Sequence, residues 1–193
     1  MKRHQTGEHN SFSTFGWQAL LLLTAFVVCA GQMAAQKAVN QFAHLTAERA
    51  AVVKAYIGAN KNLRPAMRVN CQNKFGLDSL RQSAGKQAHP YYAAADFNRD
   101  KITDFAVVLY DSSRAADARF TLLIFNGTTT GAYKLAFTNP KMDLRRGGIW
   151  TYGFGTDEAK TSVTAGEFET DDCIWVEWEN GKYAIHDCAE AEN

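Results

Sequence analysis

The segment YYAAADFNRDKITDFAVVLYD, residues 91–111, places an acidic loop between two apolar runs. The runs at residues 91–95 and 105–110 contain the aromatic and β-branched residues that are typical of strands. The loop between them is rich in Asp and Asn, which favour tight turns. The segment therefore predicts two strands joined by a tight loop, and it points to a hairpin-containing fold.

Further strand-like segments follow along the chain and end in a second hairpin. They lie at residues 120–125, 133–137, 149–154 and 162–168, separated by turn residues such as NGTTTG. This spacing of short strands favours an antiparallel arrangement.

The part of the chain before the acidic loop contains helical patterns. Residues 38–57 predict an amphipathic helix, and residues 77–82 predict a short second helix. The apolar face of the first helix would consist of Phe42, Leu45, Val52, Val53 and Tyr56. We expect residues 37–193 to form a single α+β domain, with this N-terminal helix packed on an antiparallel, hairpin-rich β-sheet.

The C-terminal segment CIWVEWENGKYAIHDC, residues 173–188, has an Asn-Gly pair at its centre. Asn180 and Gly181 form the preferred two-residue hairpin turn, because both positions require positive φ. Folding about this turn places Cys173 opposite Cys188. Opposed Cα atoms lie about 4.5 to 5.5 Å apart, within disulfide range. We predict a Cys173–Cys188 disulfide, and the alternative is that Cys71 pairs with one of these two cysteines.

Residues 1–36 have the pattern of an export leader. A net-basic start containing Lys2 and Arg3 precedes the apolar run ALLLLTAFVVCA at residues 19–30. A membrane-spanning helix needs about 20 residues, so this run is short, and the small residues after it suit a signal peptidase. We expect a signal peptide and an extracytoplasmic location, either periplasmic or secreted. The alternative is an uncleaved anchor over residues 15–33, which would then be the membrane attachment.

The charge balance argues against one class of partner. The chain has 21 Lys and Arg against 20 Asp and Glu, a formal net charge of +1. A nucleic-acid backbone requires a basic excess, so we expect no nucleic-acid partner. The partner that remains is an unknown protein, glycan or component of the cell envelope.

The acidic loop has the spacing of a calcium site. Counted from Asp96, the side chains of Asp96, Asn98 and Asp100 occupy positions 1, 3 and 5, the carbonyl of Ile102 position 7, and Asp104 position 9. This alternation directs oxygen atoms toward a central ion, and three carboxylates with one amide suit Ca²⁺ better than Mg²⁺. The alternative is an ion-free turn in which Asp and Asn accept hydrogen bonds from their own backbone.

The stretch DFNRDKITDFAVVL, residues 96–109, resembles the calcium loops of FG-GAP and VCBS-type repeats. These loops follow the pattern D-x-[DN]-x-D-G-x-x-D before an apolar strand, as in integrin α-subunit propellers and many secreted bacterial proteins. The resemblance implies a structural Ca²⁺ bound in a single copy of the loop. Lys101 replaces the usual Gly, so we expect backbone strain and weak binding, with a Kd on the order of 10⁻⁴ to 10⁻³ M.

The pattern favours an exported, non-catalytic, calcium-stabilised module whose role is structural or binding. The alternative is an enzyme or enzyme inhibitor of the cell envelope with a site that the sequence does not reveal. A cleft that gathers histidine and carboxylates away from Asp96 would favour this alternative. Trp150, Trp175 and Trp178 could form an exposed aromatic strip, although we expect them in the sheet core.

Overall fold

A computed structural model describes residues 40–85, 88–153 and 161–189. The helices of this part are α2 (Ala47–Ala59) and α3 (Lys74–Ala84), with short 3-10 helices at Arg68–Asn70 and Ala116–Ala118. Its strands are β1 (Leu63–Pro65), β2 (Tyr92–Ala95), β3 (Asp104–Asp111), β4 (Phe120–Gly127), β5 (Tyr133–Met142), β6 (Gly147–Gly153), β7 (Thr161–Glu167), β8 (Cys173–Glu179) and β9 (Lys182–Asp187). The predicted leader and anchor lie outside the described residues.

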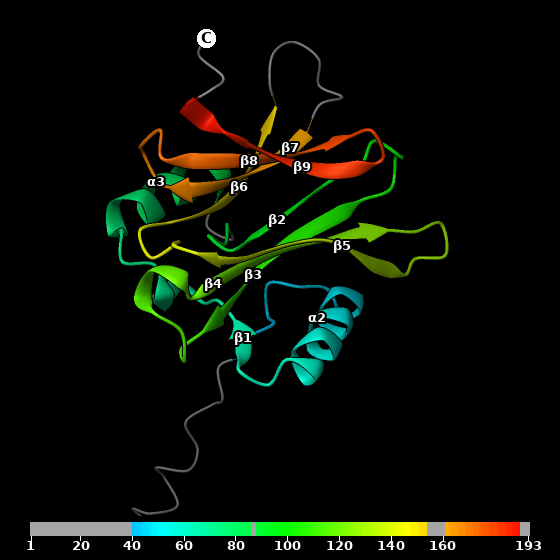
Figure 1. Cartoon of the computed structure of the whole chain (residues 1–193), viewed down its shortest axis with the longest axis horizontal. Coiled ribbons are helices and arrows are strands. Elements are labelled where there is room, and N and C mark those ends of the chain that lie inside the picture. Colours follow the sequence, from blue (N-terminus) through cyan, green and yellow to red (C-terminus); the bar gives the residue numbers. More distant parts are fainter. Residues whose placement is uncertain (1–39, 86–87, 154–160, 190–193) are drawn as a thin grey trace, which may run out of the picture. The chain divides into compact units, whose positions relative to one another are not determined.

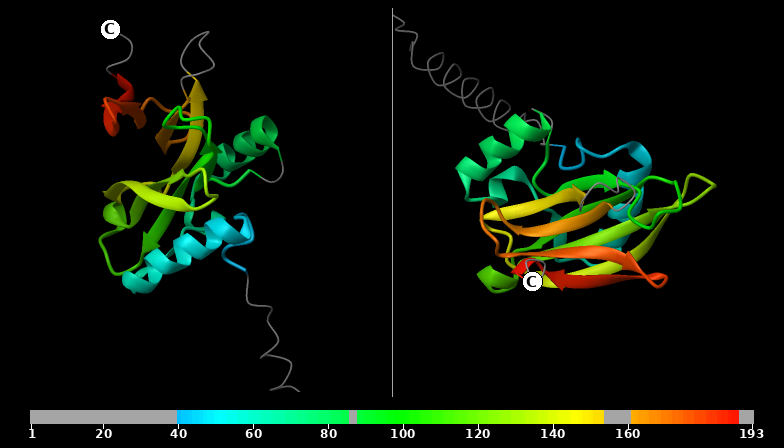
Figure 2. Two further views of the ribbon diagram at one scale, coloured as in Figure 1. Left: turned by 90° about the vertical axis from the view of Figure 1, so that its right-hand side faces the viewer. Right: turned by 90° about the horizontal axis from the view of Figure 1, so that it is seen from above.

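The strands form two antiparallel sheets rather than the one sheet predicted from the sequence. The first sheet has the order β1-β3-β4-β5, with β2 also paired to β3, and the second has the order β6-β7-β8-β9. Within the unit of residues 41–193, the second sheet covers one face of the first, and α2 covers the other (Figure 1). Two views at right angles show the same layers (Figure 2). The antiparallel prediction is confirmed.

The two central strands explain why this arrangement buries so much apolar surface. Every residue of β3 except Tyr110 is buried, and every residue of β4 except Asn126 is buried. Phe105 and Val107 of β3 belong to a cluster that also contains Val53 of α2. Ala106 and Val108 face the second sheet. Side chains alternate between the faces of a strand, so a strand buried on both faces has a continuous apolar sequence such as FAVVL.

Helix α2 is shorter than the pattern predicted, because it begins at Ala47 and not near residue 38. The Thr46 side chain accepts a hydrogen bond from the N–H of Arg49 and caps the helix. Phe42 and Leu45 lie before the helix but still pack against the cluster around Val53. The helical spacing of these two residues was therefore misleading.

Helix α3 covers one end of the space between the sheets. Leu77 and Leu80 pack against the core between the two sheets. At Gly76 an added Cβ would lie 2.5 Å from the Cβ of Phe168, so glycine permits this close contact. The sequence predicted a helix here but underestimated its length.

The closing hairpin has the predicted register. Glu179 pairs with Lys182 across the turn. Cys173 and Cys188 lie at disulfide distance, with their Cα atoms 5.4 Å apart, and are bonded. Cys71 is buried as a free thiol. In the part of the chain that the structure describes, no helix has the length and apolar character needed to cross a membrane.

Candidate cation sites

The loop between β2 and β3 has an unusual backbone. Arg99 and Lys101 have φ angles of 63° and 68°, in the left-handed region that favours glycine. The strain expected at Lys101 is therefore present. The loop maintains this conformation through hydrogen bonds between its own amides and its acidic side chains.

Asp96, Asn98 and Asp100 organise the outer part of this loop. The two carboxylate oxygens of Asp96 accept hydrogen bonds from the amides of Asp100 and Lys101, at 3.1 and 2.7 Å. Asn98 Oδ1 accepts from the Asp100 amide at 3.1 Å, and Asp100 Oδ1 accepts from the Ile102 amide at 2.8 Å. Each carboxylate oxygen has two lone pairs, so one amide bond leaves capacity for a cation.

Asp104 fixes the base of the loop. It is fully buried, and its Oδ2 accepts from the amides of Phe97 and Asn98, at 2.8 and 3.1 Å. Its Oδ1 accepts from the Gly127 amide of β4 at 2.8 Å. Burial raises the pKa of Asp104 above its usual value, and the three amides oppose that shift by favouring the charged form. A cation beside Asp104 would oppose it further.

Glycine is required at 127 for this contact with Asp104. A Cβ added there would lie 2.6 Å from the backbone oxygen of Thr103 and 2.7 Å from a side-chain carbon of Ile102. β4 therefore approaches the loop closely enough for its amide to reach the Asp104 carboxylate. Ile102 is half-buried at this contact.

The Asp96, Asp100 and Asp104 carboxylates lie close enough to affect one common neighbour. Burial raises the pKa of Tyr183, and the negative charges of these three residues raise it further. The Tyr183 hydroxyl donates to Asn126 Oδ1 at 2.6 Å. Tyr183 of strand β9 therefore lies close enough to the acidic loop to be affected by its negative charges.

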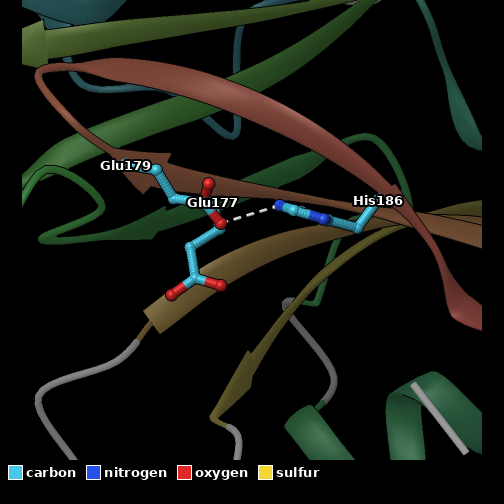
Figure 3. Close-up of side chains that lie close together, drawn as sticks. All are labelled: Glu177, Glu179 and His186. Carbon is cyan, nitrogen blue, oxygen red and sulfur yellow. Dashed lines mark ion pairs between the residues drawn. The ribbon is translucent and has the colours of Figure 1, made fainter. Parts of the chain in front are cut away.

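A different group of possible ligands lies on the closing hairpin, in β8 and β9. One ligand atom each from Glu177, Glu179 and His186 lies within 4.8 Å of the other two, and no other group of three His, Cys, Asp or Glu residues meets this criterion among the described residues. Figure 3 shows the two carboxylates and the imidazole on one side of the hairpin. The three loop aspartates thus do not converge as closely as this group.

The loop and the hairpin group are neighbours. Arg99 of the loop forms an ion pair with Glu177 of β8. In Figure 1 the green loop between β2 and β3 lies beside the turn end of the orange and red hairpin. The sequence analysis did not predict the hairpin group. The register set by the Asn-Gly turn places His186 on the same face as Glu177 and Glu179, so the group could have been predicted from it.

Among the described residues, the other two histidines form a separate pair. The rings of His44 and His89 stack with their centroids 3.9 Å apart. Burial lowers the pKa of His44 to about 4. Burial, together with the proximity of His44 and Arg68, lowers the pKa of His89 to about 3. Both imidazoles are therefore neutral at physiological pH.

The larger described cavity has a volume of about 700 Å³ and lies between α3, β2 and β6. Its lining includes His89, Trp150 and Glu169. Trp150 and Trp178 pack against the core, whereas Trp175 stacks on His186. The three tryptophans thus do not form one exposed strip.

Comparisons with known protein families, with curated proteins and with solved structures found no match to this chain. Its function must therefore be argued from its own residues.

Proposed function

We propose that the chain is an exported, non-catalytic module that Ca²⁺ stabilises at the loop of residues 96–104. The ligands would be the side chains of Asp96, Asn98, Asp100 and Asp104 and the carbonyl of Ile102. Its partner would be a protein, a glycan or a component of the cell envelope. In this proposal, residues 1–36 direct export, and residues 37–193 form the exported α+β domain.

The observation that carries the proposal is the tight winding of this loop. Two non-glycine residues, Arg99 and Lys101, are held at positive φ, at a cost of about 1 kcal/mol or more each. Acidic side chains at alternating positions accept hydrogen bonds from the loop's own amides, as in the ion-free alternative, but each carboxylate oxygen keeps a lone pair for a cation. A cation would relieve the repulsion between the carboxylates. Its binding would thereby offset the cost of the strained backbone.

The cysteine pair supports the proposed location. Disulfides persist mainly in oxidising compartments, and Cys173 and Cys188 are placed for one. The leader-like pattern of residues 1–36 is an independent argument for the same compartment.

The enzymatic alternative rests on the larger cavity, because His89 and Glu169 both line it. A general base works best when its pKa is near the working pH. The pKa of His89, about 3, is far below that range, and its ring is stacked on His44. The non-catalytic proposal therefore ranks first.

Thermal unfolding of the full chain in Ca²⁺, in equal Mg²⁺ and in chelator tests the calcium proposal. With a Kd on the order of 10⁻⁴ to 10⁻³ M, about 1 mM Ca²⁺ should add about 0.4 to 1.4 kcal/mol of stability. Asp100→Asn, which removes one charge of the site, should abolish this gain. The matched control Asp171→Asn changes an exposed aspartate in the turn before β8, and this variant should keep the stability gain from Ca²⁺. Equal melting temperatures in all three solutions would refute calcium binding.

A further inference from the structure

The outer face of the β8–β9 hairpin concentrates three side chains of types that can serve as metal ligands. Glu177 and Glu179 are two residues apart in β8, so they project from the same face. His186 lies on the paired strand β9, opposite Trp175. The strand register therefore brings together one nitrogen ligand and two carboxylates that are seven to nine residues apart in sequence.

The imidazole of His186 is held in place but lacks a hydrogen bond at Nε2. Its ring stacks on Trp175, with centroids 5.2 Å apart and an interplanar angle of 19°. Nε2 is inaccessible to solvent and makes no hydrogen bond within the described part of the chain. It nevertheless lies 2.8 Å from Oε1 of Glu179, as an ion-pair contact without hydrogen-bond geometry. When the ring proton is on Nδ1, Nε2 and the Glu179 oxygen both present lone pairs and can share a cation.

We propose that Glu177, Glu179 and His186 form a binding site for a divalent transition-metal ion, Zn²⁺ in particular. Imidazole nitrogen is a ligand of Zn²⁺ and its neighbours in the transition series, whereas Ca²⁺ and Mg²⁺ prefer oxygen alone. One nitrogen and two carboxylates supply three protein ligands, and water completes the coordination. The side chains of Glu177, Glu179 and His186 are 24%, 39% and 31% exposed, so the ion and its water can enter. Its ligands are separate from those of the calcium loop.

Arg99 is the internal competitor for this site. Its guanidinium forms an ion pair with Glu177, and both side chains are partly exposed. Such a surface pair contributes little stability, so Zn²⁺ can displace it. Removing this competitor should strengthen Zn²⁺ binding by up to about fivefold. A merely structural role for Glu177 predicts no such gain.

Calorimetric titration of Zn²⁺ into the untagged full chain, with about 1 mM Ca²⁺ present, tests the proposal. We expect one bound ion, with an affinity at least about tenfold above that for Ca²⁺ at this site. His186→Gln and Glu179→Gln should each weaken binding at least about tenfold. Asp187→Asn, a neighbour in β9, should leave it unchanged, and Arg99→Gln should strengthen it. Circular dichroism verifies that each variant is folded.

Two results would overturn the proposal. The first is absence of Zn²⁺ binding to the wild-type chain at millimolar concentration. The second is binding that His186→Gln leaves intact but His44→Gln or His89→Gln abolishes, which would assign the ion to the stacked histidine pair. Asp100→Asn should remove the calcium effect and retain Zn²⁺ binding, so failure of either proposal can be recognised separately.

Discussion

The acidic loop and the hairpin group are two neighbouring collections of candidate ligand side chains with different origins. The loop takes all its candidate ligands from residues 96–104, so their spacing is visible in the sequence. The hairpin group joins Glu177 and Glu179 to His186 through the pairing of two strands. Adjacent ligands can be recognised as a motif, whereas ligands from paired strands become visible only when the register is known.

The two collections also differ in how deeply they enter the fold. Asp104 is fully buried and binds amides from the loop and from β4. The hairpin side chains are partly exposed. Changes at the base of the loop should therefore cost folding stability, and changes in the hairpin group should cost mainly metal binding. Four experiments test or extend this contrast, starting with the largest expected effect.

The largest effect is expected for Asp104→Ala. It leaves the amides of Phe97, Asn98 and Gly127 without their acceptor, and a buried unsatisfied donor costs about 1 to 3 kcal/mol. We expect a loss of about 3 kcal/mol or more in the free energy of unfolding, measured by urea denaturation. Glu179→Gln is the matched change in the hairpin group and should cost under about 0.5 kcal/mol. Equal losses of unfolding free energy for the two variants would contradict the expected difference between the loop and the hairpin group.

Reduction of the Cys173–Cys188 bond should affect the hairpin group and spare the loop. The two cysteines are 15 residues apart, and a loop of this size contributes about 3 kcal/mol by the chain-entropy estimate. We expect the double Cys→Ser variant to melt at a lower temperature and to bind Zn²⁺ more weakly, while its response to Ca²⁺ persists. Non-reducing peptide mapping that links Cys71 to either cysteine would contradict this pairing.

Acidification should destabilise the chain through a histidine pair that belongs to neither site. The folded-state pKa values of His44 and His89, about 4 and about 3, lie below the ordinary value of 6.5. The unfolded chain therefore binds more protons between pH 6.5 and 3, and the free energy of unfolding falls as the pH falls through this window. Because both rings are partly exposed, we expect a loss of about 1 to 2 kcal/mol.

The rings lie beside Tyr91, Tyr92 and Arg68, and tyrosine and arginine side chains do not titrate in this window. The share of the pH slope that arises at this pair therefore belongs to the histidines. Replacing both histidines with Gln should remove their share of the pH slope, measured by denaturation in chelator at several pH values. An unchanged slope would show that the carboxylates alone cause the acid sensitivity.

The smallest effect is expected for Lys101→Gly. Glycine accepts the positive φ of this position, but it also gives the unfolded chain more freedom, so we expect a net gain of about 0.5 kcal/mol. Removal of the positive charge should also strengthen Ca²⁺ binding. Lys141→Gly is the matched control, because Lys141 has a φ of 66° in β5, outside the loop. Equal responses of the two variants to Ca²⁺ would show that the backbone strain at Lys101 has no connection with calcium binding.

The sequence alone predicted the features that depend on neighbouring residues. The antiparallel strands and the Asn-Gly hairpin with its register follow from local propensity and turn chemistry. The left-handed backbone at Lys101 was expected from the resemblance to FG-GAP and VCBS-type loops, which have Gly at this position. The predicted start of the first helix was wrong. The Thr46 cap sets the start of α2 at Ala47, whereas the helical spacing of Phe42 and Leu45 had suggested that the helix begins near residue 38.

Tertiary structure decided how these elements combine. The strands divide into two sheets because β3 and β4 need cover on both faces, and α2 and the second sheet supply it from distant parts of the chain. Asp104 receives the Gly127 amide, and Arg99 meets Glu177, only after β4 and β8 are in place. The periodicity of the sequence indicates which residues are buried and which form turns. It does not indicate which distant surface covers the buried residues, because any apolar partner of suitable shape can bury them.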